Sequence, residues 1–153
     1  MREPVCALFN VAVNQIARRL MPKGWDVAED APDNYDALVR HYNATGRILV
    51  WSGASDKTQF ADPATNHAFR AWHDYRHITQ GADFSREGET LTYEMQRADL
   101  AKWFGMHHPF SKWRHYCQRL LRIEVIGQLD YADTHGGAFP VDQWKFTKAE
   151  LMK

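Results

Sequence analysis

Two histidines four residues apart, His73 and His77, are the residues of this chain best suited to bind a metal ion. On a helix, this spacing places both imidazoles on one face, one turn apart. Neutral imidazole nitrogens are good ligands for zinc, manganese and iron. The pair therefore predicts a divalent metal site; the alternative is two histidines on a helix surface or in a satisfied core.

Glu124 is the third metal ligand that we expect from the sequence. It lies among Ile123, Val125 and Ile126, so the pattern places it close to the core. An ionised carboxylate in such surroundings requires a cation or a network of hydrogen bonds. A salt bridge to one of the arginines, Arg70, Arg76 or Arg122, would satisfy the same requirement and stays open as the alternative.

Two further carboxylates, Asp74 and Glu89, are candidates for a general base. Asp74 projects about 100° away from His73 on an ideal helix, so it is a ligand, a partner that orients a ligand, or a solvated charge. Glu89 begins a polar series with Tyr93 and Gln96 at helical spacing on the following helix. A carboxylate that does not bind the metal could accept the proton of an attacking water.

Four more side chains are candidates for substrate binding. Arg70 and Arg76 lie on the helix of the two histidines and could hold an anionic small molecule by charge-assisted hydrogen bonds. The alternative for each is a surface position or a salt bridge. Gln96 and Gln128 add polar groups on otherwise apolar helical faces, where they could contact a substrate.

The elements that must position these residues are predicted to be helices. Apolar residues at three- and four-residue spacing, with caps and stops such as Asp62-Pro63, Gly81 and Ser85, indicate about five helices: 4–20, 34–45, 63–79, 86–104 and 112–134. A short final helix is expected in the tail 139–153. The run 47–52 is either a short strand or an extended segment without a partner. We expect one mainly α domain over 1–153, with the metal site within 60–145.

Composition excludes several classes of protein. Lys plus Arg and Asp plus Glu are 19 each, so the net charge is zero, which argues against strong nucleic-acid binding. No apolar run reaches the roughly 18 residues of a membrane span, and residues 1–20 do not read as a signal peptide. Cys6 and Cys117 have no zinc-type or disulfide-framework spacing and are interpreted as reduced. We expect a cytoplasmic protein, in the host cell if a phage encodes it.

The stretch from Phe69 to His77, followed by Gly81, Phe84 and Gly88-Glu89, resembles a pattern in uncharacterised bacteriophage and prophage proteins. Segments 124–128 and 137–143 look like parts of the same family. The resemblance covers roughly residues 60–145. It implies a phage-related origin but no established activity.

HD-type phosphohydrolases offer a second, weaker resemblance. These helical enzymes hold a metal with a His, a His-Asp pair and a distant Asp. His41, His73-Asp74 and Asp130 or Asp133 occur in that order with similar spacing. The resemblance implies phosphohydrolase chemistry on a metal held by those residues.

Two functions from different classes follow from the sequence. The first is a metal-dependent hydrolase acting on a small phosphorylated, nucleotide-like or amide substrate. The alternative is a non-enzymatic phage protein that binds a host protein, with the polar cluster serving as a structural hydrogen-bond network.

Overall fold

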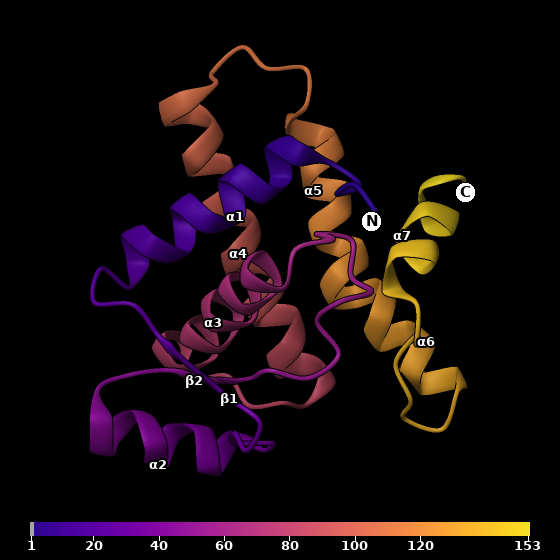
Figure 1. Cartoon of the computed structure of the whole chain (residues 1–153). Coiled ribbons are helices and arrows are strands. Elements are labelled where there is room, and N and C mark those ends of the chain that lie inside the picture. The colour runs from indigo at the N-terminus through magenta and orange to yellow at the C-terminus, as the bar shows by residue number, and fades with distance from the viewer. Residues whose placement is uncertain (1) are drawn as a thin grey trace.

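The computed structural model describes residues 2–153 and confirms the predicted mainly α fold. Its elements are α1 (Ala7–Leu20), β1 (Asp26–Ala28), α2 (Tyr35–Thr45), β2 (Leu49–Trp51), α3 (Pro63–Gln80), α4 (Arg86–His107), α5 (Arg114–Arg122), the π-helical turn η1 (Ile123–Gly127), α6 (Gln128–Thr134) and α7 (Gln143–Leu151). In Figure 1, α1 lies across α3, and α5, η1 and α6 follow one another as a single long rod.

The short strand predicted near 47–52 has a partner. β2 pairs in parallel with β1, with Val27 opposite Val50, and α2 makes the crossover between them. β1 could not be recognised in the sequence because it has three residues and only one, Val27, is β-branched. In Figure 1 the two strands lie just above α2, which forms the lower edge of the molecule.

The helix that carries both histidines has clear signals at its two ends. The Asp62 carboxylate accepts the backbone N–H groups of Ala64 and Thr65, and Pro63 occupies the first turn. Gly81 ends the helix at a φ of 60°, a left-handed conformation that glycine adopts without a steric penalty. Only four residues separate α3 from the Ser85 cap of α4, so the first turn of α4 must lie beside the last turns of α3.

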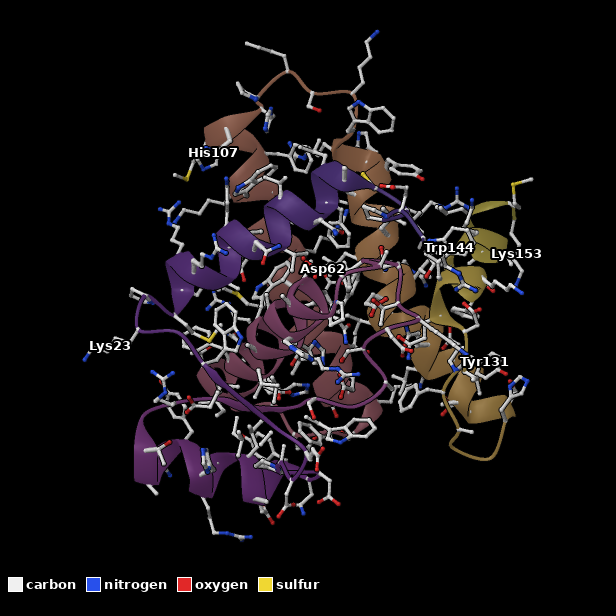
Figure 2. All side chains as sticks on the ribbon, viewed as in Figure 1. Lys23, Asp62, His107, Tyr131, Trp144 and Lys153 are labelled. Carbon is white, nitrogen blue, oxygen red and sulfur yellow. The ribbon has the colours of Figure 1, made fainter. Side chains whose placement is uncertain are left out.

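The core is centred between α1, α3, α4 and α5. Its largest fully buried side chains are Phe9, Phe60, Trp72 and Phe104. Figure 2 shows side chains filling the space between these helices, with α7 on the right-hand side of the view. Trp144 of α7, labelled there, donates its indole N–H to the carbonyl of Glu3, which holds the N-terminal segment against α7.

No helix among residues 2–153 is long and apolar enough to cross a bilayer.

Candidate metal centre

His73, His77 and Glu89 meet at the C-terminal half of α3. The two Nε2 atoms are 3.1 Å apart, and Glu89 Oε2 lies 2.9 Å from His73 Nε2 and 3.2 Å from His77 Nε2. Ligands bound tetrahedrally at the usual zinc distances are separated by about 3.3 Å. Among the residues that the structure describes, these three form the one group of His, Cys, Asp or Glu close enough together to share an ion.

The outer nitrogens of both rings are occupied by other partners. His77 Nδ1 lies 2.8 Å from the carbonyl oxygen of Ala82, which can only accept, so this nitrogen carries the proton. His73 Nδ1 lies 2.6 Å from Gln96 Oε1. Both neutral rings therefore present the lone pair of Nε2 to Glu89. Partners on the outer nitrogen are the usual means by which proteins orient histidine ligands toward a metal.

Three lone pairs within 3.2 Å of one another repel unless positive charge lies among them. A proton on His73 supplies that charge in the metal-free protein. Burial lowers the pKa of His73, but the hydrogen bond and charge of Glu89, with help from Asp74, outweigh burial and raise it to about 9. Burial by itself would raise the pKa of Glu89. Its hydrogen bonds to both histidines outweigh burial and lower that pKa to about 2. A divalent cation would meet the same electrostatic need.

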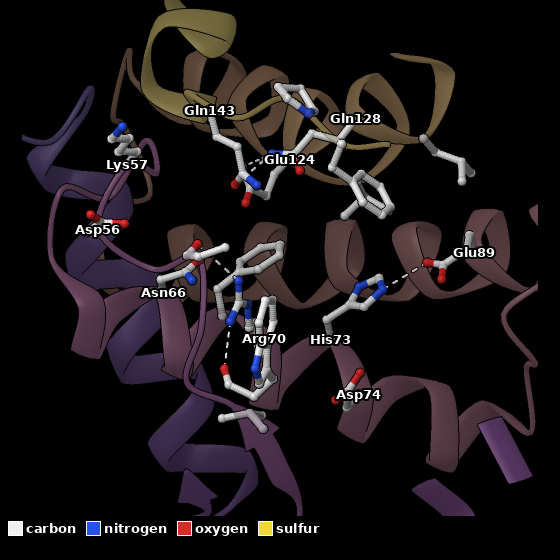
Figure 3. A pocket seen from close by; sticks show the side chains of 18 of the residues that line it. Asp56, Lys57, Asn66, Arg70, His73, Asp74, Glu89, Glu124, Gln128 and Gln143 are labelled. Carbon is white, nitrogen blue, oxygen red and sulfur yellow. Dashed lines mark hydrogen bonds and ion pairs between the residues drawn. The ribbon is translucent and has the colours of Figure 1, made fainter. Parts of the chain in front are cut away.

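Asp74 lies next to this cluster without joining it. Burial raises the pKa of its carboxyl to about 6, although the two histidines and Arg70 act in the opposite direction. Its carboxylate has no hydrogen-bond partner among residues 2–153 and lines the cavity beside His73 (Figure 3). A carboxyl group with a pKa raised toward neutrality, unpaired and facing a cavity, is suited to accept a proton.

A cavity of about 740 Å³ opens onto the cluster. His73, Asp74 and Glu89 lie in its wall, whereas His77 is fully buried behind them. The opposite wall comes from η1, α6 and the segment before α7, as Figure 3 shows. This volume is typical of pockets that bind small molecules.

The structure exchanges the positions expected for the two glutamates. Glu89, expected as a base, lies against both imidazoles, and Glu124, expected as a ligand, does not. The Glu124 Oε2 atom accepts from Gln59 Nε2 at 2.8 Å and from Gln128 Nε2 at 3.0 Å, across the cavity from the histidines. The reason is the short α3–α4 connection, which brings the first turn of α4 to His73, while Glu124 belongs to the opposite wall.

The expected substrate-binding residues have other partners. Arg76 makes a two-point ion pair with Asp99, at 2.6 and 2.8 Å, and Trp72 Nε1 donates to the same carboxylate. Of the interpretations that the sequence left open for Arg76, the salt bridge is therefore the one observed. Arg70 lines the cavity, but its guanidinium donates to the carbonyls of the segment 51–54. Gln96 orients His73, and Gln128 holds Glu124.

The ligand set implied by the HD resemblance is not brought together. Asp130 and Asp133 both pair with Arg86 at the surface, and His41 lies on α2 beside Asp26. None of these three residues lines the cavity of His73 and Asp74.

Several cavity residues carried no signal in the sequence because they lie in loops without helical spacing. They include Ala54, Asp56 and Lys57. Phe139, Pro140, Val141 and Gln143 also line the cavity. These residues belong to the segment 137–143, which resembles the phage proteins. In the sequence, this resemblance was the only indication that they belong to a site.

Comparisons with protein-family models, with curated proteins and with solved structures find no match to this chain. The phage-related origin therefore stays a prediction, and the case for function rests on the site itself.

Proposed function

We propose that this protein is a metal-dependent hydrolase whose ion is held by His73, His77 and Glu89. The observation that carries the proposal is the convergence of two imidazole lone pairs and a carboxylate within 3.2 Å at one wall of a cavity. Three protein ligands leave a coordination position open, as in catalytic zinc sites. Zinc, manganese and iron all suit this donor set.

The chemistry proposed is water attack on a carbonyl or phosphoryl group. A metal ion at such a site would lower the pKa of a water that it binds and would polarise the carbonyl or phosphoryl oxygen of the group under attack. Asp74 accepts the proton of the attacking water, because its carboxyl group is free, faces the cavity and has a pKa near neutrality. Glu89 and the histidines act as ligands, and Gln96 keeps the His73 ring in its orientation.

Metal content of the purified protein tests the metal site. After supplementation with Zn²⁺, Mn²⁺ or Fe²⁺ and desalting, we expect close to one equivalent in the wild type and a large loss in His77→Ala. His115→Ala, which removes an exposed histidine of α5, is the matched control and should keep the metal. Less than about 0.2 equivalents of every metal in the folded wild type would leave only a structural ion pair between His73 and Glu89.

Hydrolysis assays test the enzyme class. The metal-loaded protein is offered chromogenic phosphate-ester, carboxylic-ester and anilide substrates. We expect metal-dependent turnover of one class, with a loss of about 100-fold or more in Asp74→Asn, a typical contribution of a general base. If Asp74→Asn binds the metal and keeps full activity, Asp74 is not the base. If the metal-loaded wild type turns over none of them, the alternative of a non-enzymatic binding protein gains support.

A further inference from the structure

The charges around the cavity point to its substrate. Apart from His73, whose proton is bound to Glu89 in the metal-free protein, the charged residues in its wall are Asp56, Lys57, Arg70, Asp74, Glu89 and Glu124. Four of these six are carboxylates. The Arg70 guanidinium is turned to the carbonyls of Trp51 and Gly53, at 2.6 Å each, so it is already engaged within the protein. Lys57 is thus the one cation of the described cavity wall that is available to a ligand.

A second polar centre lies across the cavity from the histidines. Glu124 is its acceptor, and both amide donors that reach it, Gln59 and Gln128, bind the same oxygen, Oε2. Oε1 has no hydrogen-bond partner among residues 2–153. Gln143 lies beside Gln128 and also faces the cavity, as Figure 3 shows. A partly buried carboxylate with one free oxygen is a receptor for a donor, above all for a cation.

Apolar side chains make up most of the rest of the wall. Phe69, Val125 and Leu129 lie between the two polar centres, and Trp51, Phe139 and Val141 are exposed at the rim. Trp51 is 50 % exposed and Val141 86 % exposed, so a ligand that covers them would remove apolar surface from water. The cavity is therefore complementary to a molecule with an apolar body and polar groups at both ends.

We propose that the substrate is an amide with an apolar body and a protonated amino group at the end remote from the scissile bond, and that Glu124 receives this group. The inference deepens the proposed hydrolase function and chooses the amide over the phosphorylated class. Hydrolysis consumes one water, whose oxygen bonds to the carbonyl carbon; the C–N bond breaks, and the departing nitrogen gains a proton. A phosphorylated substrate bound to the metal would bring further negative charge beside Asp74 and would give the free oxygen of Glu124 no donor.

Binding of three probes with one apolar body tests the preference directly. We use 3-phenylpropylamine, 3-phenylpropanol and 3-phenylpropyl phosphate with metal-free protein at pH 7.5, measured by calorimetry or protein-observed NMR. The amine should bind about tenfold or more tighter than the phosphate, because a charge pair in a partly desolvated site is favourable. Equal binding, or tighter binding of the phosphate, overturns the inference without recourse to any variant.

Two isosteric variants locate the recognition. Glu124→Gln should lower the affinity for the amine about tenfold and leave that for the alcohol nearly unchanged. Glu94→Gln removes the same charge at an exposed position outside the cavity and should leave the amine affinity unchanged. If both variants, or neither, weaken the amine, Glu124 is not its receptor.

Metal uptake keeps this test separate from that of the hydrolase. A protein that takes up zinc but prefers the phosphate refutes the substrate class alone. A protein that takes up no zinc but selects the amine through Glu124 refutes the hydrolase and retains the recognition site.

A second, independent observation concerns the two cysteines. Cys6 Sγ and Cys117 Sγ are 4.0 Å apart, although 111 positions separate them in the chain. Cys6 is partly exposed at the N-terminus of α1, and Cys117 is buried in α5. The contact with Cys117 and the backbone N–H groups of α1 lower the pKa of Cys6, against the opposing effect of burial. Thiolates at helix N-termini are reactive nucleophiles.

We infer that this cysteine pair is a site of reversible oxidation by peroxides. The Cys6 thiolate attacks one peroxide oxygen, the O–O bond breaks, and a sulfenic acid forms with release of water. The Cys117 sulfur then attacks the Cys6 sulfur, and a disulfide forms with loss of a second water. Two electrons pass from the two thiols to the peroxide. The sulfur atoms need to approach by about 2 Å.

Intact mass after treatment with hydrogen peroxide tests this site. The wild type should lose about 2 Da and regain it with dithiothreitol, as expected for one disulfide. Cys117→Ser should instead gain about 16 Da or more at Cys6, because no second thiol traps the sulfenic acid. Stepwise oxygen addition to the wild type without the 2 Da loss, or no reaction, would contradict the inference.

Discussion

At the scale of single residues, the partners of the outer ring nitrogens decide what His73 and His77 can do. Ala82 and Gln96 accept from the Nδ1 atoms, so both Nε2 atoms are turned toward Glu89. The same residues in a surface helix would be an ordinary pair of solvated histidines. Neither of these partners could be assigned from residue spacing, because one is a backbone carbonyl and the other lies on the following helix.

Replacement of Gln96 should weaken metal binding without removing a ligand. Gln96→Met leaves His73 Nδ1 without its acceptor, and losses of such orienting bonds typically cost about 10- to 100-fold in metal affinity. The measurement is zinc affinity by competition with a chromophoric chelator. Gln128→Met, which replaces a buried glutamine on the opposite wall, is the control and should bind zinc normally. Equal affinities in the two variants would contradict the orienting role.

The raised pKa of His73 predicts a pH dependence of stability in the metal-free protein. Its pKa in the folded state is about 9, above the roughly 6.5 of an unfolded chain. The protonated ring therefore stabilises the fold fully below pH 6.5, and this contribution is lost as the pH rises through 9. We expect the difference in Tm between wild type and His73→Gln to shrink from pH 6.5 to pH 9.5 in the presence of a chelator. A difference that stays constant over this range would show that the His73 ring does not gain its proton from Glu89.

At the scale of elements, the turn from α3 to α4 sets the position of Glu89. Gly88 is the third residue of α4, and its N–H donates to the Ser85 hydroxyl at 3.1 Å. A Cβ atom at Gly88 would lie 1.9 Å from the carbonyl oxygen of Asp83, a contact that the backbone can relieve only by moving. The glycine thus permits the tight turn that holds the next residue, Glu89, against both histidines.

Gly88→Ala should therefore reduce both stability and metal affinity. We expect a loss of about 1–3 kcal/mol in the free energy of unfolding, since the clash outweighs the helical preference of alanine. Zinc affinity should fall as well, because Glu89 moves with the turn. Gly105→Ala is the control within the same helix: nothing lies within 4 Å of its added Cβ, and it should stabilise by up to about 1 kcal/mol. Denaturant unfolding of both variants measures the change in stability, and zinc titration measures the change in affinity.

The π-helical turn η1 is the second element that shapes the site. It interrupts the rod of α5 and α6 at Ile123–Gly127, and it contains Glu124. Such turns widen a helix by one residue and occur often at functional sites. The sequence predicted one continuous helix over this region, because helical periodicity alone does not reveal a single widened turn.

At the scale of the whole molecule, a metal ion at this site would raise the free energy of unfolding of the entire domain. The ligands come from α3 and α4, and α3 packs against α1, so their release requires the core to open. An ion that binds the folded state alone adds about 2.7 kcal/mol at 100 times its Kd, which corresponds to about 5–10 °C in Tm for a domain of this size. We expect this shift in thermal unfolding of the wild type with zinc and no shift in His77→Ala. A shift of the same size in both proteins would place the ion elsewhere.

The sequence by itself determined the helices and the two imidazoles. Residues within one helix have positions fixed by a constant rise and rotation, so His73 and His77 could be paired from their numbers alone. Capping residues such as Asp62, Gly81 and Ser85 are also local, and the bounds of α3 followed from them within about one residue.

Only the tertiary structure decided which carboxylate completes the cluster and which faces it across a cavity. In the sequence, Glu89 and Glu124 are similar candidates for the site, because both are carboxylates on helices near apolar neighbours. Their positions depend on the turn at Gly88 and on the packing of α5, η1 and α6 over α3, which are relations between elements rather than within them. Hydrogen bonds and charge act over a few ångströms in space, whatever the distance along the chain. This is why Asp56 and Lys57, in a loop without periodicity, line the same cavity as His73.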